Sequence, residues 1–289
     1  MKILVQNYIN GESSEAGYFH ETFNNIGLQC QMWSDNMSAY DKLDSYSPDV
    51  LVCHYMWMSH DIFKYFSNRS NMSLILNVTG ATQNEVEIIE DIITKNNVQA
   101  PFFYTNLSKN MNKVKPKKIK LHSIMNGADI FFGFAQQPSV EYDIDLGIVS
   151  DYTIGSRFSD AKEGIKSWHT LTTSPDLESA DVKSDLRMMS LLFQNYKKLI
   201  VSTESGRVGQ SFFDAVLYGK DVEFRGKYET QQENAQKDIE LFLGKDKEKW
   251  RKRLSSNHTC LNRAKQLLSK LKHEEAEKAV DKLIKGIAL

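Results

Sequence analysis

Short apolar runs alternate with helical patterns along the first part of the chain. The apolar runs predict buried strands at 2–8, 29–33, 49–55, 74–79, 101–106 and 118–125. Between them, apolar residues recur every three or four positions, which predicts helices at 18–27, 59–68 and 85–97. Strands that alternate with helices favour a parallel sheet with helices on both faces.

The same alternation resumes in the second part of the chain. The pattern predicts strands at 142–150 and 197–204, and helices at 160–171, at 181–196 and from about Gly209 to Gly219. Beyond about residue 229 the chain is charged and helical. Gly and Pro interrupt the pattern at 126–141, which predicts the domain boundary there.

A chain of 289 residues is long enough for two domains, each with its own core. We therefore predict an α/β fold with two Rossmann-like, doubly wound domains that face one another across a cleft, where ligands of such folds bind. The expected parts are a first domain at 1–130, a second at 131–270, and a C-terminal helix at 271–289 that packs back on the first domain.

Composition narrows the class of protein. Hydrophobic residues at 41% and charged residues at 25% are typical of globular domains, and a net charge of −1 gives no overall field that attracts nucleic acid or an anionic membrane. The lysine-rich segment 109–120 is either a solvated loop or a site for a polyanionic acceptor or membrane surface. No run reaches the length of a membrane span and the start resembles no signal peptide, so we expect a cytoplasmic protein.

Metal and disulfide chemistry find no support in the sequence. The three cysteines, Cys30, Cys53 and Cys260, are odd in number and widely spaced, which favours reduced thiols and offers no zinc spacing. No cluster of His, Asp and Glu has ligand spacing either, so we predict no metal site.

Four motifs occur in a characteristic order. They are NGESSEAGYFHETFNNIGLQC after the first strand, PDVLVCHYMW on a later strand, MNGADIFF before the linker, and GQSFFDAVLYG at 209–219. In this order they resemble the motifs of GT-B glycosyltransferases of the group 1 or family 4 type and of CgeB-like proteins. The last motif aligns without gaps to the second part of that family's donor-site signature. Three positions depart from it: Asp214 stands for Glu, Ser211 stands for Pro, and Glu204 lies ten positions before Asp214 rather than eight.

The resemblance implies a transferase that moves a sugar from a nucleotide-sugar co-substrate, such as a UDP-sugar, to an acceptor hydroxyl on a glycan or polysaccharide, with no bound metal or other cofactor. The donor diphosphate would lie on the turn from Gly206 to Gly209, beside Arg207, where helix N-terminal amides favour an anion. Asp214 would accept the ribose hydroxyls, or would only complement the helix dipole. Glu204 would contact the donor sugar or its phosphates.

A second resemblance concerns the segment VSDYTIGSRFSD at 149–160. It is similar to the phosphate-binding segment of phage DNA β-glucosyltransferases, which implies donor contacts for Ser150 and Arg157. Each arginine of the proposed donor site, Arg157 and Arg207, is alternatively a solvated loop residue. This similarity adds DNA modification as an alternative function, with a hydroxymethylated base in duplex DNA as acceptor. A third alternative is a nucleotide-sugar-binding protein without turnover.

For the catalytic base or acceptor contact, the first domain offers His20, His54, Asp35 and Glu21, of which the two histidines are the leading candidates. His54 follows a predicted strand at its carboxyl end, and His20 lies on the first predicted helix. An imidazole titrates near neutral pH and can remove a proton from an acceptor hydroxyl. Both residues have structural alternatives. His54, His20 and Glu204 are therefore the candidate catalytic residues.

Overall fold

The computed structural model divides the chain into two compact units. The first unit comprises residues 1–125 and 263–283, and the second comprises 126–262 and 284–289. The structure describes residues 1–6, 14–33, 37–69, 72–98, 100–105, 113–124, 127, 144–150, 158–172, 180–183, 189, 191–203, 208–228, 233–243, 252–254, 256–271 and 273–286. Residues 263–270, which the sequence placed in the second domain, cluster with the first unit.

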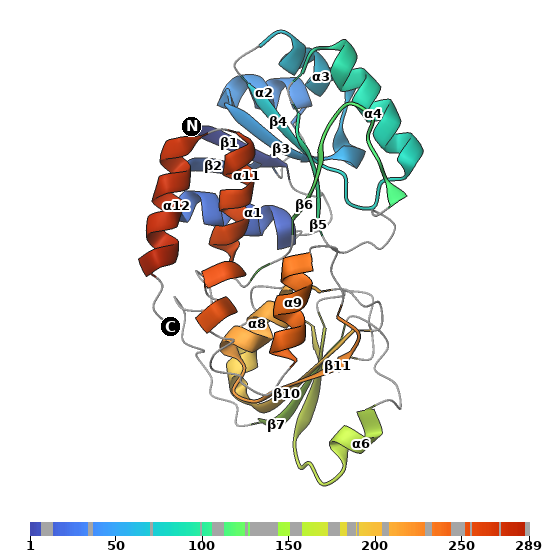
Figure 1. The fold of residues 1–289 in the computed structure, drawn as a ribbon, viewed down its shortest axis with the longest axis vertical. Helices are drawn as coiled ribbons and strands as arrows, with labels where there is room; N and C mark the ends of the chain where they lie inside the picture. The colour runs from blue at the N-terminus through green and yellow to red at the C-terminus, as the bar shows by residue number, and fades with distance from the viewer. Residues whose placement is uncertain are drawn as a thin grey trace. The chain divides into compact units, whose positions relative to one another are not determined.

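The first unit holds a six-stranded parallel sheet in the order β2-β1-β3-β4-β5-β6 (Figure 1). Its strands are β1 (Lys2–Gln6), β2 (Gln29–Trp33), β3 (Val50–His54), β4 (Ser73–Asn77), β5 (Phe102–Thr105) and β6 (Leu121–Ile124). Its connecting helices are α1 (Ser14–Asn25), α2 (Ala39–Tyr46), η1 (Tyr55–Trp57), α3 (His60–Ser67) and α4 (Gln83–Lys95). The strands and helices predicted for this unit are confirmed, and α2 and η1 are additional.

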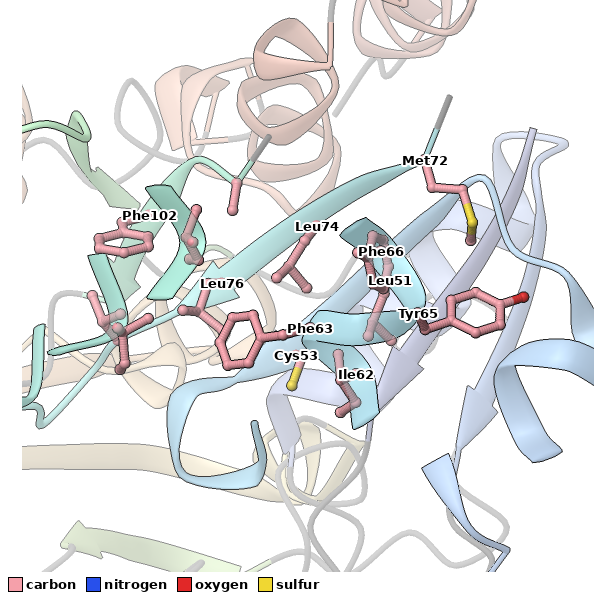
Figure 2. Close-up of a cluster of buried hydrophobic side chains, with 14 of the residues drawn as sticks. Leu51, Cys53, Ile62, Phe63, Tyr65, Phe66, Met72, Leu74, Leu76 and Phe102 are labelled. Carbon is pink, nitrogen blue, oxygen red and sulfur yellow. The ribbon is translucent and has the colours of Figure 1, made fainter. Parts of the chain in front are cut away.

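Apolar side chains of α3 and α4 cover one face of this sheet. Figure 2 shows Phe63 and Phe66 of α3 beside Leu51, Leu74 and Leu76 of the strands, all of them buried. On the strands the apolar runs are buried because helices cover a parallel sheet on both faces. On the opposite face, the ring of Phe19 of α1 contacts the ring of Phe103 of β5 edge to face, with centroids 6.3 Å apart.

Two C-terminal helices belong largely to the first unit. They are α11 (Cys260–Lys270) and α12 (Glu274–Gly286). Buried apolar residues line one side of each, with Leu267 and Leu268 on α11 and Val280 on α12. An ion pair between Lys265 and Asp281 joins the two helices. The residues from 274 to 283 thus cluster with the first unit, as residues 1–125 do.

The second unit holds a five-stranded parallel sheet in the order β11-β10-β7-β8-β9. Its strands are β7 (Ile144–Ser150), β8 (Trp168–Thr172), β9 (Val182–Lys183), β10 (Tyr196–Thr203) and β11 (Val222–Gly226). Its helices are α6 (Ser159–Lys162), η4 (Phe193–Asn195), α8 (Gln210–Tyr218) and α9 (Glu233–Phe242). The α/β class with two doubly wound parallel sheets is thereby confirmed, whereas a cleft between the units stays a prediction.

The helix predicted at 160–171 is wrong. Only the single turn α6 forms, and Gly164 then takes a left-handed conformation with φ of 74°, which starts the run into β8. The segment WHTLT of β8 is rich in aromatic and β-branched residues, which favour a strand. The helix predicted at 181–196 is wrong at both ends, since it begins as β9 and its last residue starts β10.

Gly219 ends α8, as the sequence predicts, but the reason is close packing. Its backbone has φ of −69° and ψ of 138°, which any residue adopts. A Cβ there would lie 2.5 Å from the carbonyl oxygen of Ala215 and 2.5 Å from Cγ2 of Val222. Only glycine lets the chain turn from α8 into β11 at this distance.

We expect Gly219→Ala to lower the free energy of unfolding by about 2 kcal/mol, because the backbone oxygen cannot move aside without disturbing α8. Urea denaturation measures the change. Gly286→Ala is the control, because a Cβ at Gly286 would meet no atom within 4 Å. Equal stability of the two variants would contradict the packing explanation.

Candidate functional site

The strand order of the second sheet places a switch point between β7 and β10. From β7 the chain proceeds to β8 on one side, and the later strands β10 and β11 lie on the other side. In open parallel sheets, ligands bind at the carboxyl ends of the strands that flank such a point. Ser150 ends β7 and stands in register with Ser202 of β10, so two hydroxyl side chains meet there.

A row of polar residues crosses three strands at this edge. Ser202 is in register both with Ser150 of β7 and with Arg225 of β11. Neighbours in register on parallel strands project to the same face of a sheet. Ser150 is buried, with 4% of its surface exposed. The predicted donor residue Ser150 therefore shares its face with a cation that the sequence analysis did not find.

Helix α8 starts at the same edge, after β10. Gly209 is its N-cap residue, with φ of −87° and no side-chain cap on the helix. A Cβ at this position would meet no atom within 4 Å, so neither backbone conformation nor protein packing requires glycine here. The first amides of a helix have no partner within the helix and favour an anion.

Several predicted donor residues precede α8 or follow β7 in the sequence. Glu204, Gly206 and Arg207, together with Arg157, lie outside the described residues. Their roles stay predictions. The donor motif itself spans α8 from its N-cap Gly209 to its C-cap Gly219.

Asp214 lies in the middle of α8 and is 1% exposed. The first turn of α8 contains no acidic residue, and the helix dipole acts mainly on the first turn. The dipole alternative for Asp214 therefore loses its support. The ribose role stays a prediction, and it requires that the atoms covering this side chain move when a ligand binds.

His54 ends β3 at the carboxyl edge of the first sheet. Its Nε2 lies 3.2 Å from the carbonyl oxygen of Thr79, and the backbone N–H of Met56 donates to its Nδ1 at 3.4 Å. These contacts correspond to the neutral tautomer that is protonated at Nε2. Burial lowers the pKa of His54, and the hydrogen bond to Thr79 opposes this shift. To accept a proton at Nδ1 as a base, His54 would have to lose the hydrogen bond from the backbone N–H of Met56.

We expect His54 to make stability depend on pH. Its pKa in the folded protein lies below the ordinary value of about 6.5, so the unfolded chain binds the proton more readily. The stabilisation is complete above that ordinary value and is lost as the pH falls through the folded pKa. Between about pH 7.5 and pH 5.5, the melting temperature should fall more in the wild type than in His54→Gln.

The exposed His60 provides the control, as His60→Gln should keep the pH dependence of the wild type. Equal pH dependence of His54→Gln and the wild type would show that His54 is not held neutral by the fold.

His20 lies elsewhere in the first unit. Its Nε2 contacts Nδ2 of Asn24 at 3.1 Å, and the Asn24 side chain also bonds both backbone groups of Cys30. Cys30 is near the amino end of β2, whereas His54 ends β3. Asn24, one helical turn after His20, thus attaches α1 to the amino end of β2. The role of His20 as a base at the carboxyl edge stays a prediction.

The described part of the lysine-rich segment is bound to α4. The carboxylate of Glu90, which is 2% exposed, accepts hydrogen bonds from the backbone amides of Lys117, Lys118 and Ile119. The ammonium groups of Lys117 and Lys118 pair with acidic side chains of the same helix, at 3.2 Å and 3.1 Å. Neither interpretation made from the sequence included this attachment, which neutralises part of the positive charge.

Metal-binding clusters and membrane-spanning helices are both absent from the described residues. They contain no group of three or more His, Cys, Asp or Glu side chains that could hold a metal ion. None of the helices among them is both long and apolar enough to cross a bilayer. The three cysteines are free thiols, all of them buried.

Arg225 and Ser202 are the residues at this edge that sequence reasoning missed. The segment Val222–Gly226 alternates apolar and polar residues, which is the pattern of a strand. That signal could have placed Arg225 on a strand. Its register with Ser202 and Ser150 depends on tertiary structure.

Comparison with known proteins gives distant structural neighbours alone. No family model matches the sequence, and no curated protein matches it. One similar solved structure is described as a UDP-N-acetylglucosamine 2-epimerase from Listeria monocytogenes, with 8% identity, coverage of 97% of this chain and 90% of that chain, and a TM-score of 0.38. Another is an NAD+-bound 3-phosphoglycerate dehydrogenase from Entamoeba histolytica, with 12% identity, coverage of 98% and 94%, and a TM-score of 0.27. At these scores neither neighbour assigns an activity to this chain.

Proposed function

We propose that the chain is a glycosyltransferase of the GT-B type. Its second unit binds a nucleotide-activated sugar, and its first unit presents an acceptor hydroxyl. One observation carries the proposal: α8 begins without a side-chain cap at Gly209, after β10 and beside the switch point of a parallel sheet. A diphosphate is the ligand that such a helix start favours.

The sequence motif and the helix coincide, which supports the donor role. The stretch that resembles the family's donor signature begins at the N-cap of α8 and ends at its C-cap, Gly219. Asp214 then lies within the helix, where the family carries its acidic residue. Ser150, at the end of β7, adds a hydroxyl at the neighbouring strand.

Chemistry explains why such a site suits sugar transfer. Cleavage of the donor leaves a nucleoside diphosphate and an oxocarbenium-like sugar, so catalysis depends on donors that stabilise the charge of the leaving group. Backbone amides and fixed cations supply this stabilisation without reorganisation. A UDP-sugar is the co-substrate that we propose, with no metal ion and no other cofactor.

A glycan is the acceptor that we favour. Lys117 and Lys118 pair with Glu87 and Asp91, so the described part of the lysine-rich segment has less charge to offer to a phosphate backbone. The net charge of −1 also gives no field that would attract DNA. Duplex DNA with a hydroxymethylated base remains the alternative from the second sequence resemblance.

A panel of UDP-, GDP-, ADP- and CMP-sugars tests the function. Thermal shift measures binding, and a coupled assay measures release of the free nucleotide, a nucleoside diphosphate from UDP-, GDP- and ADP-sugars and CMP from CMP-sugars, with and without glycan acceptors. We expect one nucleotide class to raise the melting temperature and to be released. Binding without release would favour the inactive binding protein, and no binding across the panel would refute a donor site.

A further inference from the structure

Helix α8 packs on a buried histidine that the candidate donor site does not include. The ring of Phe213 stacks on the imidazole of His258, with the ring centroids 5.4 Å apart and an angle of 20° between the planes. Both side chains are buried. Phe213 lies one helical turn after the N-cap Gly209, so this contact supports the turn whose first amides would bind the diphosphate.

A hydrogen bond to α9 orients the imidazole. Nε2 of His258 donates to Oδ2 of Asp238 at 2.9 Å, since an ionised carboxylate only accepts. Arg253 forms an ion pair with Oδ1 of the same carboxylate. Asp238 is 6% exposed, so these bonds are largely closed to water. Asp238 therefore fixes the orientation of the ring on which Phe213 packs.

The backbone around His258 is constrained as well. The amide of His258 donates to the carbonyl oxygen of Leu254 at 2.7 Å. Gly127 packs closely on this segment, because a Cβ at Gly127 would lie 2.9 Å from the carbonyl oxygen of His258 and 2.8 Å from that of Thr259. The amide and the hydroxyl of Thr259 both donate to Oδ1 of Asn262 at 2.8 Å. His258 is thus held through its side chain and through its backbone.

The start of α8 depends on such support because no side chain caps it at Gly209. The amide of Phe212 donates to the carbonyl oxygen of Gly209 at 3.2 Å, which closes the first turn. The ring of Phe212 contacts the ring of Phe242 edge to face, with centroids 6.0 Å apart, where α8 and α9 lie side by side (Figure 1). Apolar contacts have no preferred direction, whereas the hydrogen-bonded imidazole of His258 presents one fixed plane to the helix.

We propose that His258 is a positioning residue of the donor site, which acts through Phe213 by fixing the first turn of α8. The inference rests on the proposed function, because it assigns a diphosphate to the amides of Gln210 and Ser211. Amides that are already in the binding geometry lose less entropy when the ligand arrives, so the affinity is higher. Asp238 contributes by orienting the imidazole.

Affinity for UDP, measured by titration calorimetry where all variants are folded, tests this role in His258→Gln, in Phe213→Leu and in the double variant. His258→Gln keeps an amide donor for Asp238 and removes the ring. We expect each single variant to bind UDP about 5-fold more weakly, and the double variant to bind within about 2-fold of either, because residues that act through one contact are not additive. Additive losses, about 25-fold in the double variant, would show that His258 does not act through Phe213.

Thr170→Val is the matched control for a loss of stability. It removes a buried hydroxyl that donates to the carboxylate of Asp181 and accepts from its amide. Thr170 is on β8, which β7 separates from β10 in the sheet. The variant should lower the melting temperature and leave the affinity for UDP unchanged. An equal loss of affinity in Thr170→Val would overturn the positioning role, since affinity would then follow stability alone.

Hydrogen exchange tests whether the effect passes through α8. The amide of Phe212 should exchange faster in His258→Gln than in the wild type, and a fall in affinity without this change would contradict the inference. If His258→Gln does not fold, Asp238→Asn takes its place, because it keeps the ring of His258 and weakens its attachment. That variant should bind UDP about 3-fold more weakly.

The wild type separates this inference from the proposed function. If the wild type binds no UDP, the donor site is refuted and the positioning role falls with it. If the wild type binds UDP and the His258 variant binds it equally well, the donor site stands and the positioning role alone is overturned.

Discussion

Replacing Glu90 by alanine is expected to lower the free energy of unfolding by about 3 kcal/mol, a large share of the stability of a typical domain. The carboxylate accepts three successive backbone amides of the lysine-rich segment, including that of Lys117 at 2.8 Å and that of Ile119 at 2.5 Å. Alanine leaves all three donors without this acceptor in a site that is largely closed to water. Hydrogen bonds to a charged acceptor are also stronger than neutral ones.

Glu87→Gln is the control for this prediction. Glu87 lies on the same helix and pairs with the side chain of Lys117, but the pair is exposed, so its loss should leave the unfolding free energy close to that of the wild type. Urea denaturation of both variants compares the two carboxylates directly. A small and equal effect would show that the segment does not depend on Glu90.

Replacing Asp214 by asparagine is expected to weaken UDP binding by about 10- to 100-fold, the range for loss of one hydrogen bond to a charged group. Asparagine keeps the size of the side chain and removes its charge, so packing within α8 is preserved. Donor turnover should fall with the affinity if the carboxylate accepts the ribose hydroxyls.

A structural role for Asp214 would give a different pattern. Its side chain is 1% exposed, so an effect on stability alone would lower the melting temperature and leave the affinity unchanged at temperatures where the variant is folded. Asp61→Asn, at an exposed position of α3 in the first unit, should change neither quantity. The pair of measurements therefore distinguishes a ligand contact from a buried structural carboxylate.

The sequence predicted the first sheet well because its central strands β1, β3 and β4 are apolar on both faces. Leu4, Leu51 and Leu74 point to one face, and their neighbours along each strand are equally apolar, which leaves the strand as the favoured element. The strand β8 was mistaken for a helix because the polar residues before it resemble an amphipathic pattern. Gly164 has a left-handed backbone conformation, whereas a continuous helix over 160–171 would require right-handed helical dihedral angles at this residue.

The candidate site was predictable only where a motif lies on one element. The motif from Gly209 to Gly219 became α8, and Ser150 became the end of β7. Arg225 escaped notice because β11 was not expected and because register joins it to Ser202 across strands. The hydrogen bonds of His54 to Thr79 and Met56 were equally hidden, since they depend on how two loops meet.

We propose that a nucleoside diphosphate binds against the first amides of α8. Titration of isotopically labelled protein with UDP, followed through the backbone amide resonances, tests it most directly. We expect saturable shifts for Gly209, Gln210 and Ser211, with Ser150 responding at the neighbouring strand. Saturable binding that leaves these four amides unmoved would contradict it.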